Sequence, residues 1–178
     1  MEENLNSLDF ALLEEIAGNM MAAQHIYIWE IGYSGKLAEG LQLRLRAIMS
    51  NISASSDDFR IIQDSYRVQS EDIVIAISFT GNTQIVKNVL RARESGAKII
   101  AFTGSYDNKL YHHSDIQIVP ASYFKDHKSR YIGNEMIIKI IFDSLYVYIE
   151  NEMHNIEKGD NQTFLHHFEK SDYIQEDH

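Results

Sequence analysis

The chain has 178 residues, enough for one domain with a substantial core, and its 44% hydrophobic and 24% charged content is typical of a globular protein. Lys and Arg number 16 against 26 Asp and Glu, and the net charge of −10 opposes nucleic acid binding, which depends on neutralising phosphates. There is no apolar stretch long enough for a membrane span, no basic secretory leader and no cysteine for disulfide or thiol chemistry. We therefore expect a cytoplasmic protein that binds neither membrane nor, through this chain alone, nucleic acid.

Helical and strand patterns alternate along the chain. In chain order, periodicity predicts a helix at 5–21, a strand at 26–31, a helix from about 37 to 48, a short strand at 52–55, a helix at 58–66, a strand at 73–77, a helix at 84–95, a strand at 98–102, a helical turn at 110–114, a short strand at 116–119 and a long helix at 129–152. The long helix has an apolar side formed by Met136, Ile137, Ile140, Ile141, Leu145 and Tyr148. Continuous apolar strands between helices indicate an α/β fold with a parallel sheet covered on both faces. We expect one domain at 1–158 and a polar tail at 159–178.

The most informative motif is Ser78-Phe79-Thr80-Gly81-Asn82-Thr83, which follows the apolar strand at 73–77 and precedes a helix. The first N–H groups of a helix are unpaired and carry partial positive charge, which favours an anion. Gly81 permits close backbone approach, and Ser78, Thr80 and Thr83 add hydroxyl donors. The motif therefore predicts a phosphate-binding loop.

A second turn, Gly32-Tyr33-Ser34-Gly35, follows the strand at 26–31 in the same way. If the strand order is 2-1-3-4-5, both loops lie side by side at the carboxyl ends of neighbouring strands, where open parallel sheets bind ligands. We then expect one anion pocket built from both loops, including Gly32 and Ser34.

Other ligands fit the sequence less well. The Gly-x-Gly-x-x-Gly and Gly-Lys-Ser/Thr patterns of nucleotide-binding loops are absent. Residues Thr80 to Thr83 look like the phosphate loop of flavodoxins, but in that family the loop follows the first strand. His112 and His113 are adjacent and would point apart on a helix. The sequence therefore predicts neither a cofactor nor a metal site.

The two loops at this separation resemble those of the SIS (sugar isomerase) domain, a phosphosugar-binding family, over about residues 5–155. The resemblance implies a three-layer α/β/α sandwich with a five-stranded parallel sheet in the flavodoxin-like order 2-1-3-4-5, and a homodimer or homotetramer. It also implies that Ser34, Ser78, Thr80 and Thr83 grip the phosphate of a sugar, while Asn82 shapes the loop.

Two branches of this family remain open. The segment from Ser129 to Tyr146, with its Asp-Ser-Leu-Tyr ending, resembles the long helix of RpiR-type transcriptional regulators, whose effector domains sense a sugar phosphate. The chain has no room for their DNA-binding domain, so it would be an excised or free-standing effector domain.

The alternative branch is the aldose–ketose sugar-phosphate isomerases, such as 6-phospho-3-hexuloisomerase. These enzymes carry a glutamate on the long helix that moves a proton between two sugar carbons, and Glu135 aligns with it. The pair His166-His167 resembles a histidine of the isomerase tail, with His167 as the candidate that assists ring opening. Whether the chain is an enzyme therefore depends first on Glu135.

Overall fold

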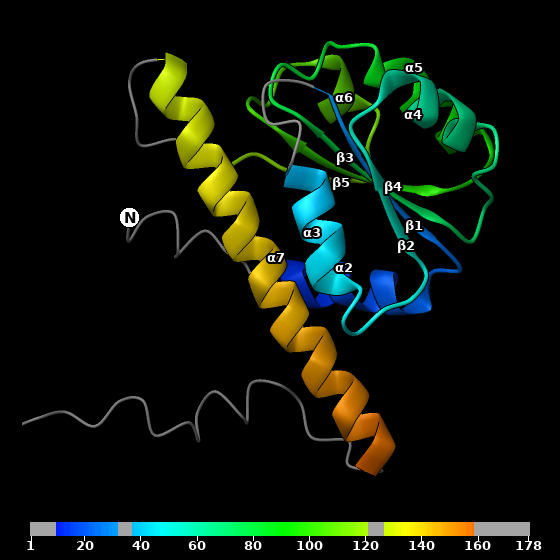
Figure 1. Cartoon of the computed structure of the whole chain (residues 1–178). Helices are drawn as coiled ribbons and strands as arrows, with labels where there is room; N and C mark the ends of the chain where they lie inside the picture. The colour runs from blue at the N-terminus through cyan, green and yellow to red at the C-terminus, as the bar shows by residue number, and fades with distance from the viewer. Residues whose placement is uncertain (1–9, 32–36, 121–126, 159–178) are drawn as a thin grey trace, which may run out of the picture.

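The computed structural model describes residues 10–31, 37–120 and 127–158, and on the last segment it describes the side chains of residues 135–156. The strands are β1 (Ile26–Glu30), β2 (Ile52–Ser55), β3 (Ile73–Ser78), β4 (Lys98–Thr103) and β5 (Ile116–Ile118). The helices are α2 (Phe10–Ala22), α3 (Leu37–Leu45), α4 (Asp58–Ser65), α5 (Ile85–Glu94), α6 (Lys109–His112) and α7 (His127–Lys158). Each of them overlaps an element predicted from the sequence (Figure 1). None of the described helices is both long and apolar enough to cross a membrane.

The strands form one parallel sheet in the predicted order β2-β1-β3-β4-β5. β3 is central and buried along its whole length. Ile73, Ile75 and Ile77 belong to the core on the side of α2, α3 and α7. Val74 and Ala76 belong to the core on the side of α4, α5 and α6, which Figure 1 shows on the opposite face. Because burying an isoleucine side chain stabilises by about 1.5–3 kcal/mol, this apolar run fixes β3 at the centre of a three-layer sandwich.

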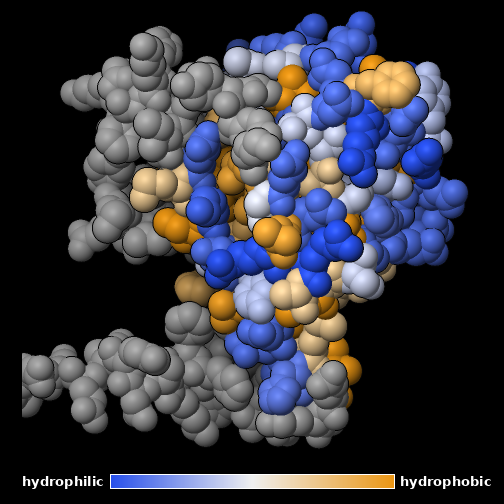
Figure 2. All heavy atoms as spheres, viewed as in Figure 1, coloured by the Kyte–Doolittle hydropathy of each residue, from blue (hydrophilic) through white to orange (hydrophobic). Residues whose placement is uncertain are grey.

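The long helix α7 crosses α2 and α3 and extends beyond them (Figure 1). It buries a stripe of apolar residues, namely Ile138, Ile141, Phe142, Leu145 and Ile149. Met136 and Ile140, which the sequence placed on the apolar side, are instead 59% and 42% exposed. The helix is apolar over much of its circumference, so its periodicity alone does not decide which residues face α2 and α3. Figure 2 shows hydrophobic side chains along the exposed side of α7.

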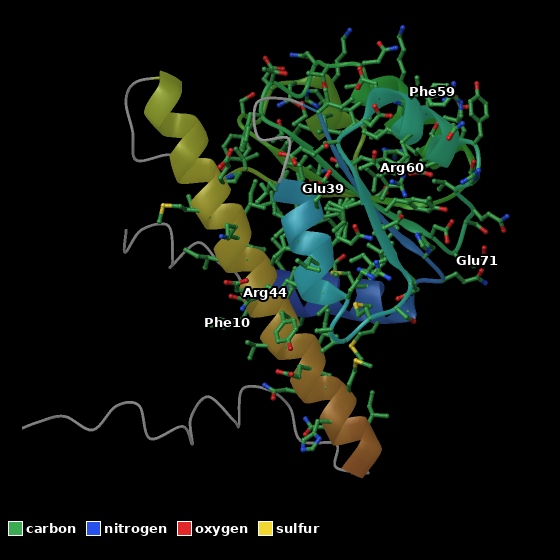
Figure 3. All side chains as sticks on the ribbon, viewed as in Figure 1. Phe10, Glu39, Arg44, Phe59, Arg60 and Glu71 are labelled. Carbon is green, nitrogen blue, oxygen red and sulfur yellow. The ribbon has the colours of Figure 1, made fainter. Side chains whose placement is uncertain are left out.

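A polar contact also fixes α7 against α3. Arg44 Nε lies 2.8 Å from Asp143 Oδ1, and the Arg44 guanidinium carbon lies 5.5 Å from the centre of the Tyr146 ring. Figure 3 shows Arg44 between the two helices. Both charged side chains are about half exposed, so this pair contributes only roughly 0–1 kcal/mol.

Candidate functional site

The strand order reverses between β1 and β3, and the carboxyl ends of these strands lie next to each other. Glu30, the last residue of β1, pairs in register with Ile77, and Ser78 ends β3. Open parallel sheets bind ligands at such a switch point. The loop after β3 belongs to the described residues, whereas Gly32 and Ser34 of the predicted first loop lie outside them.

The loop after β3 closes so that its first and last hydroxyl groups meet. Ser78 Oγ lies 3.1 Å from Thr83 Oγ1, within hydrogen-bonding distance. Ser78 is buried, Thr83 is half-buried and Thr80 is exposed. Two of the three hydroxyls are thus held together at the start of α5, and the third faces solvent.

Gly81 turns the chain in the middle of this loop. Its φ of +61° is left-handed, a conformation that side chains disfavour. Its N–H donates to the Ser78 carbonyl at 3.1 Å and closes a tight turn. A β-carbon at this position would also overlap the carboxamide of Asn108. Glycine is therefore required both by the backbone conformation and by the close approach of another segment.

Helix α5 begins directly after the loop with an open N-terminus. The N-cap residue, Gln84, makes no side-chain cap hydrogen bond. The N–H groups of Thr80, Asn82 and Thr83 find no acceptor within the described part of the chain. Unpaired N–H groups and the helix dipole attract an anion at such a position. A phosphate bound there would meet backbone N–H groups and hydroxyls from the same loop.

The segment after β4 holds this loop from its other side. The N–H of Gly104 donates to the carbonyl of Phe79 at 3.0 Å. The N–H of Leu110, in α6, donates to the carbonyl of Gly81 at 2.8 Å. These hydrogen bonds use carbonyl groups of the loop, so its N–H groups remain available.

The side chain of Asn82 joins the same support. Its Oδ1 accepts a hydrogen bond from the N–H of Lys109 at 3.2 Å, and the residue is otherwise exposed. The sequence suggests that the loop at 105–110 contributes to sugar specificity, but it does not indicate that this segment supports the loop after β3. Its only local signal is Asn108, a residue type that favours helix N-caps, directly before the predicted helical turn.

A buried carboxylate lies at the end of β1. Glu30 is 1% exposed, and its Oε2 accepts a hydrogen bond from the N–H of Ala38 at 2.9 Å. Ala38 lies in the first turn of α3, so the Glu30 side chain caps a backbone N–H at the N-terminus of that helix. In the sequence, the only signal for Glu30 is its charge at the end of an apolar strand, and this signal alone predicts no role. One N–H group at the N-terminus of α3 is therefore already paired with a side chain of the protein itself.

The candidate catalytic residues are Glu135 and His167, and neither is seen in contact with the loop after β3 among the described residues. Glu135 is half-buried in α7, one turn before the buried Ile138. No contact between described residues connects Glu135 with the loop after β3. His167 lies outside the described residues. No group of three or more His, Asp or Glu side chains within the described segments is arranged to hold a metal ion.

The fold is that of a doubly wound α/β protein, with the loop after β3 at the strand switch point. The chain belongs to the SIS domain family, whose model matches residues 19–123, more than half of its length. This confirms the resemblance predicted from the two loops.

Known relatives include transcriptional regulators. An HTH-type transcriptional regulator of Clostridium perfringens is 27% identical over 154 residues, which cover 86% of this chain and 55% of the regulator. The chain thus spans about half the length of the curated regulators it matches first.

Solved structures show the same fold. The sugar isomerase domain of an RpiR transcription factor from Sphaerobacter thermophilus superposes with a TM-score of 0.72 at 16% identity, covering 89% of each chain. The Vibrio vulnificus NanR protein, solved in complex with ManNAc-6P, superposes with a TM-score of 0.67 at 16% identity, covering 90% of this chain and 66% of NanR.

Proposed function

We propose that this chain binds a phosphorylated sugar at the carboxyl ends of β1 and β3, as the effector-sensing domain of an RpiR-type transcriptional regulator in the cytoplasm. The observation that carries the proposal is the loop from Ser78 to Thr83, with paired hydroxyls, a left-handed glycine and an open helix N-terminus. The regulator relatives and the phosphosugar complex of NanR support the same assignment.

In this proposal each part of the loop has a defined task. Backbone N–H groups at the start of α5 and the hydroxyls of Ser78, Thr80 and Thr83 donate to the phosphate oxygens. Gly81 keeps the turn close to the ligand, and Asn82 holds the loop against Lys109. Hydrogen bonds to a charged oxygen contribute about 1.5–3 kcal/mol each, so three or four of them give roughly micromolar to millimolar affinity after entropic costs.

The first loop completes the site in our proposal, with Gly32 and Ser34 approaching the ligand from the end of β1. Ser34 is proposed to grip the phosphate together with Ser78, Thr80 and Thr83.

A second copy of the chain is part of the proposal. Met136, Ile140 and Val147 lie within one narrow stripe of α7 and are 59%, 42% and 41% exposed. Leu43 of α3, the helix that contacts α7, is 77% exposed. An apolar stripe of this kind is typical of a helix that packs against a partner. We propose a homodimer or homotetramer that uses this face.

The alternative function is an aldose–ketose isomerase in which Glu135 is the base. One observation favours it: Glu135 lies on the long helix α7, where the resemblance to the isomerases places their glutamate, and it is half-buried. Loss of solvent proton exchange at the carbon next to the carbonyl in Glu135→Gln would support this assignment. Unchanged activity in that variant would exclude the role of Glu135.

One experiment tests the proposed site. The protein is incubated with a panel of ketose and aldose phosphates, with free sugars as controls, while thermal stabilisation and product formation are both recorded. We expect stabilisation without turnover, lost when Ser78→Ala is combined with Thr83→Ala. The matched control combines Ser50→Ala with Ser70→Ala, two exposed hydroxyls outside the loop, and should keep the full shift.

The outcomes separate the two functions. Turnover of any panel member favours the isomerase, and absence of a shift with every phosphosugar overturns phosphosugar binding. An undiminished shift in the folded double variant would place the ligand elsewhere.

A further inference from the structure

Helix α6 is too short to be stable by itself. It contains four residues, and a single helical turn fixes more backbone than its hydrogen bonds repay. Its position therefore depends on what holds its first turn, which contains the Lys109 and Leu110 N–H groups that bind the phosphate loop.

Asn108 is the residue that holds this turn. It is the N-cap of α6 and is 5% exposed. Its Oδ1 accepts from the N–H of Tyr111 at 2.9 Å. Its Nδ2 donates to Thr103 Oγ1 at 2.7 Å and to the Ser105 carbonyl at 2.8 Å. One buried carboxamide thus joins the end of β4, the connecting loop and the start of α6.

The same carboxamide lies directly against the phosphate loop. A β-carbon at Gly81 would overlap Oδ1 and Cγ of Asn108, so the two residues fit together only because Gly81 has no side chain. Gly81 is also the residue whose carbonyl accepts from Leu110 and whose φ is left-handed. Asn108 therefore supports the turn at the centre of the loop both by contact and through α6.

We propose that Asn108 is a positioning residue of the phosphate site, which sets the loop in its binding conformation before a ligand arrives. This inference rests on the proposed function. It predicts that the loop N–H groups are aligned in the ligand-free protein, so that binding does not have to order them. Such preorganisation raises affinity because the loop loses its conformational entropy during folding and not during binding. In this proposal the buried Asn108 acts on the loop and does not bind the ligand itself.

The test compares two N-cap residues. Asn108→Ala removes the cap and the contact with Gly81, whereas Asp57→Ala removes the cap of α4, whose Oδ1 accepts from the Arg60 N–H at 2.8 Å. Each variant loses one helix cap, but only Asn108→Ala also removes a contact with the loop from Ser78 to Thr83. Asn108→Asp keeps the cap acceptor and loses the Nδ2 donor, so it remains available if Asn108→Ala does not fold.

Two readouts are needed, because a cap that is merely structural lowers only stability. The first is amide hydrogen exchange over residues 79–84 and 104–110 in the ligand-free protein. The second is calorimetric binding of inorganic phosphate and of any panel phosphosugar. For Asn108→Ala we expect faster exchange at both segments and an affinity at least about tenfold weaker, whereas Asp57→Ala should leave both unchanged.

The two proposals fail in different ways. If the unmodified protein binds neither phosphate nor phosphosugar, the proposed function is overturned, and the exchange data still decide whether Asn108 orders the loop. If a folded Asn108 variant shows unchanged exchange, or faster exchange with unchanged affinity, the positioning role is overturned while the phosphate site stands. Equal losses of affinity in the Asn108 and Asp57 variants would also overturn it.

Discussion

The hydroxyl oxygens of Ser78 and Thr83 lie 3.1 Å apart across the loop that joins β3 to α5. Only one of the two can donate to the other at a time, so the second proton is free to point elsewhere. When the hydrogen bond between the two hydroxyls breaks, a phosphate oxygen beside the pair can accept from both of them. The loop is therefore closed in advance around groups that an anion can use.

Gly81→Ala should destabilise the protein and weaken phosphosugar binding together. The left-handed backbone and the overlap with Asn108 would cost roughly 1–3 kcal/mol of unfolding free energy, and the loop would relax away from its turn. Chemical denaturation and calorimetric titration measure the two effects.

Gly40→Ala is the matched control for that change. Gly40 lies in α3, and a β-carbon there meets nothing within 4 Å. It should stabilise the helix by about 0.5–1 kcal/mol. Full phosphosugar affinity in a folded Gly81→Ala variant would contradict the assigned role of the turn.

Glu30→Ala should lower the free energy of unfolding by about 1–3 kcal/mol, because it leaves the N–H of Ala38 without the buried oxygen that accepts its hydrogen bond. Glu30→Gln keeps an oxygen that can accept from the same N–H, so it should be the less destabilising of the two variants. Chemical denaturation measures both free energies. Equal losses in the two variants would contradict the assigned role of this hydrogen bond.

Asp64→Asn should raise thermal stability at neutral pH. Burial raises the pKa of Asp64 above its ordinary value of 3.8, and the shift is reduced by the positive charges of Arg60, Arg67 and His25. Since the folded state binds this proton more tightly than the unfolded state, ionised Asp64 opposes folding. The destabilisation of the folded state by ionised Asp64 is complete above the raised pKa. It decreases as the pH falls through that pKa and is absent below 3.8.

The measurement is the melting temperature of the Asp64→Asn and unmodified proteins from pH 7 down to pH 3. The advantage of the variant should shrink on acidification. Glu71→Gln, which removes an exposed carboxylate (Figure 3), controls for the change of net charge. An advantage that does not depend on pH would contradict the titration argument.

Charges on the exposed stripe of α7 should separate the subunits. Met136→Lys combined with Ile140→Glu places two charges where the proposed interface is apolar, so light scattering should show a monomer of unchanged fold. Phe59→Glu alters an equally apolar residue, 67% exposed, on α4 across the sheet (Figure 3), and should leave the mass unchanged. A monomeric unmodified protein, or an assembly that survives the double variant, would contradict the proposed face.

The sequence by itself determined the order of elements, the parallel sheet and the position of the loop from Ser78 to Thr83. Each of these depends on local patterns: continuous apolar strands, helical periodicity and a glycine-containing turn between them. The family could be predicted as well, because its loop motifs are short contiguous segments. The binding residues themselves remain predictions, as do the parts played by Gly32, Ser34 and His167.

Only the tertiary structure decided which distant groups meet at the loop. Asn108 follows Gly81 by 27 positions, and their fit depends on β3 and β4 being neighbours in the sheet. The exposure of Met136 and Ile140 likewise depends on how α7 lies across α2 and α3. The apolar character of a residue does not show which neighbouring element will bury its side chain. Close approach and burial arise from packing between segments, whereas a sequence pattern reports only what each segment favours locally.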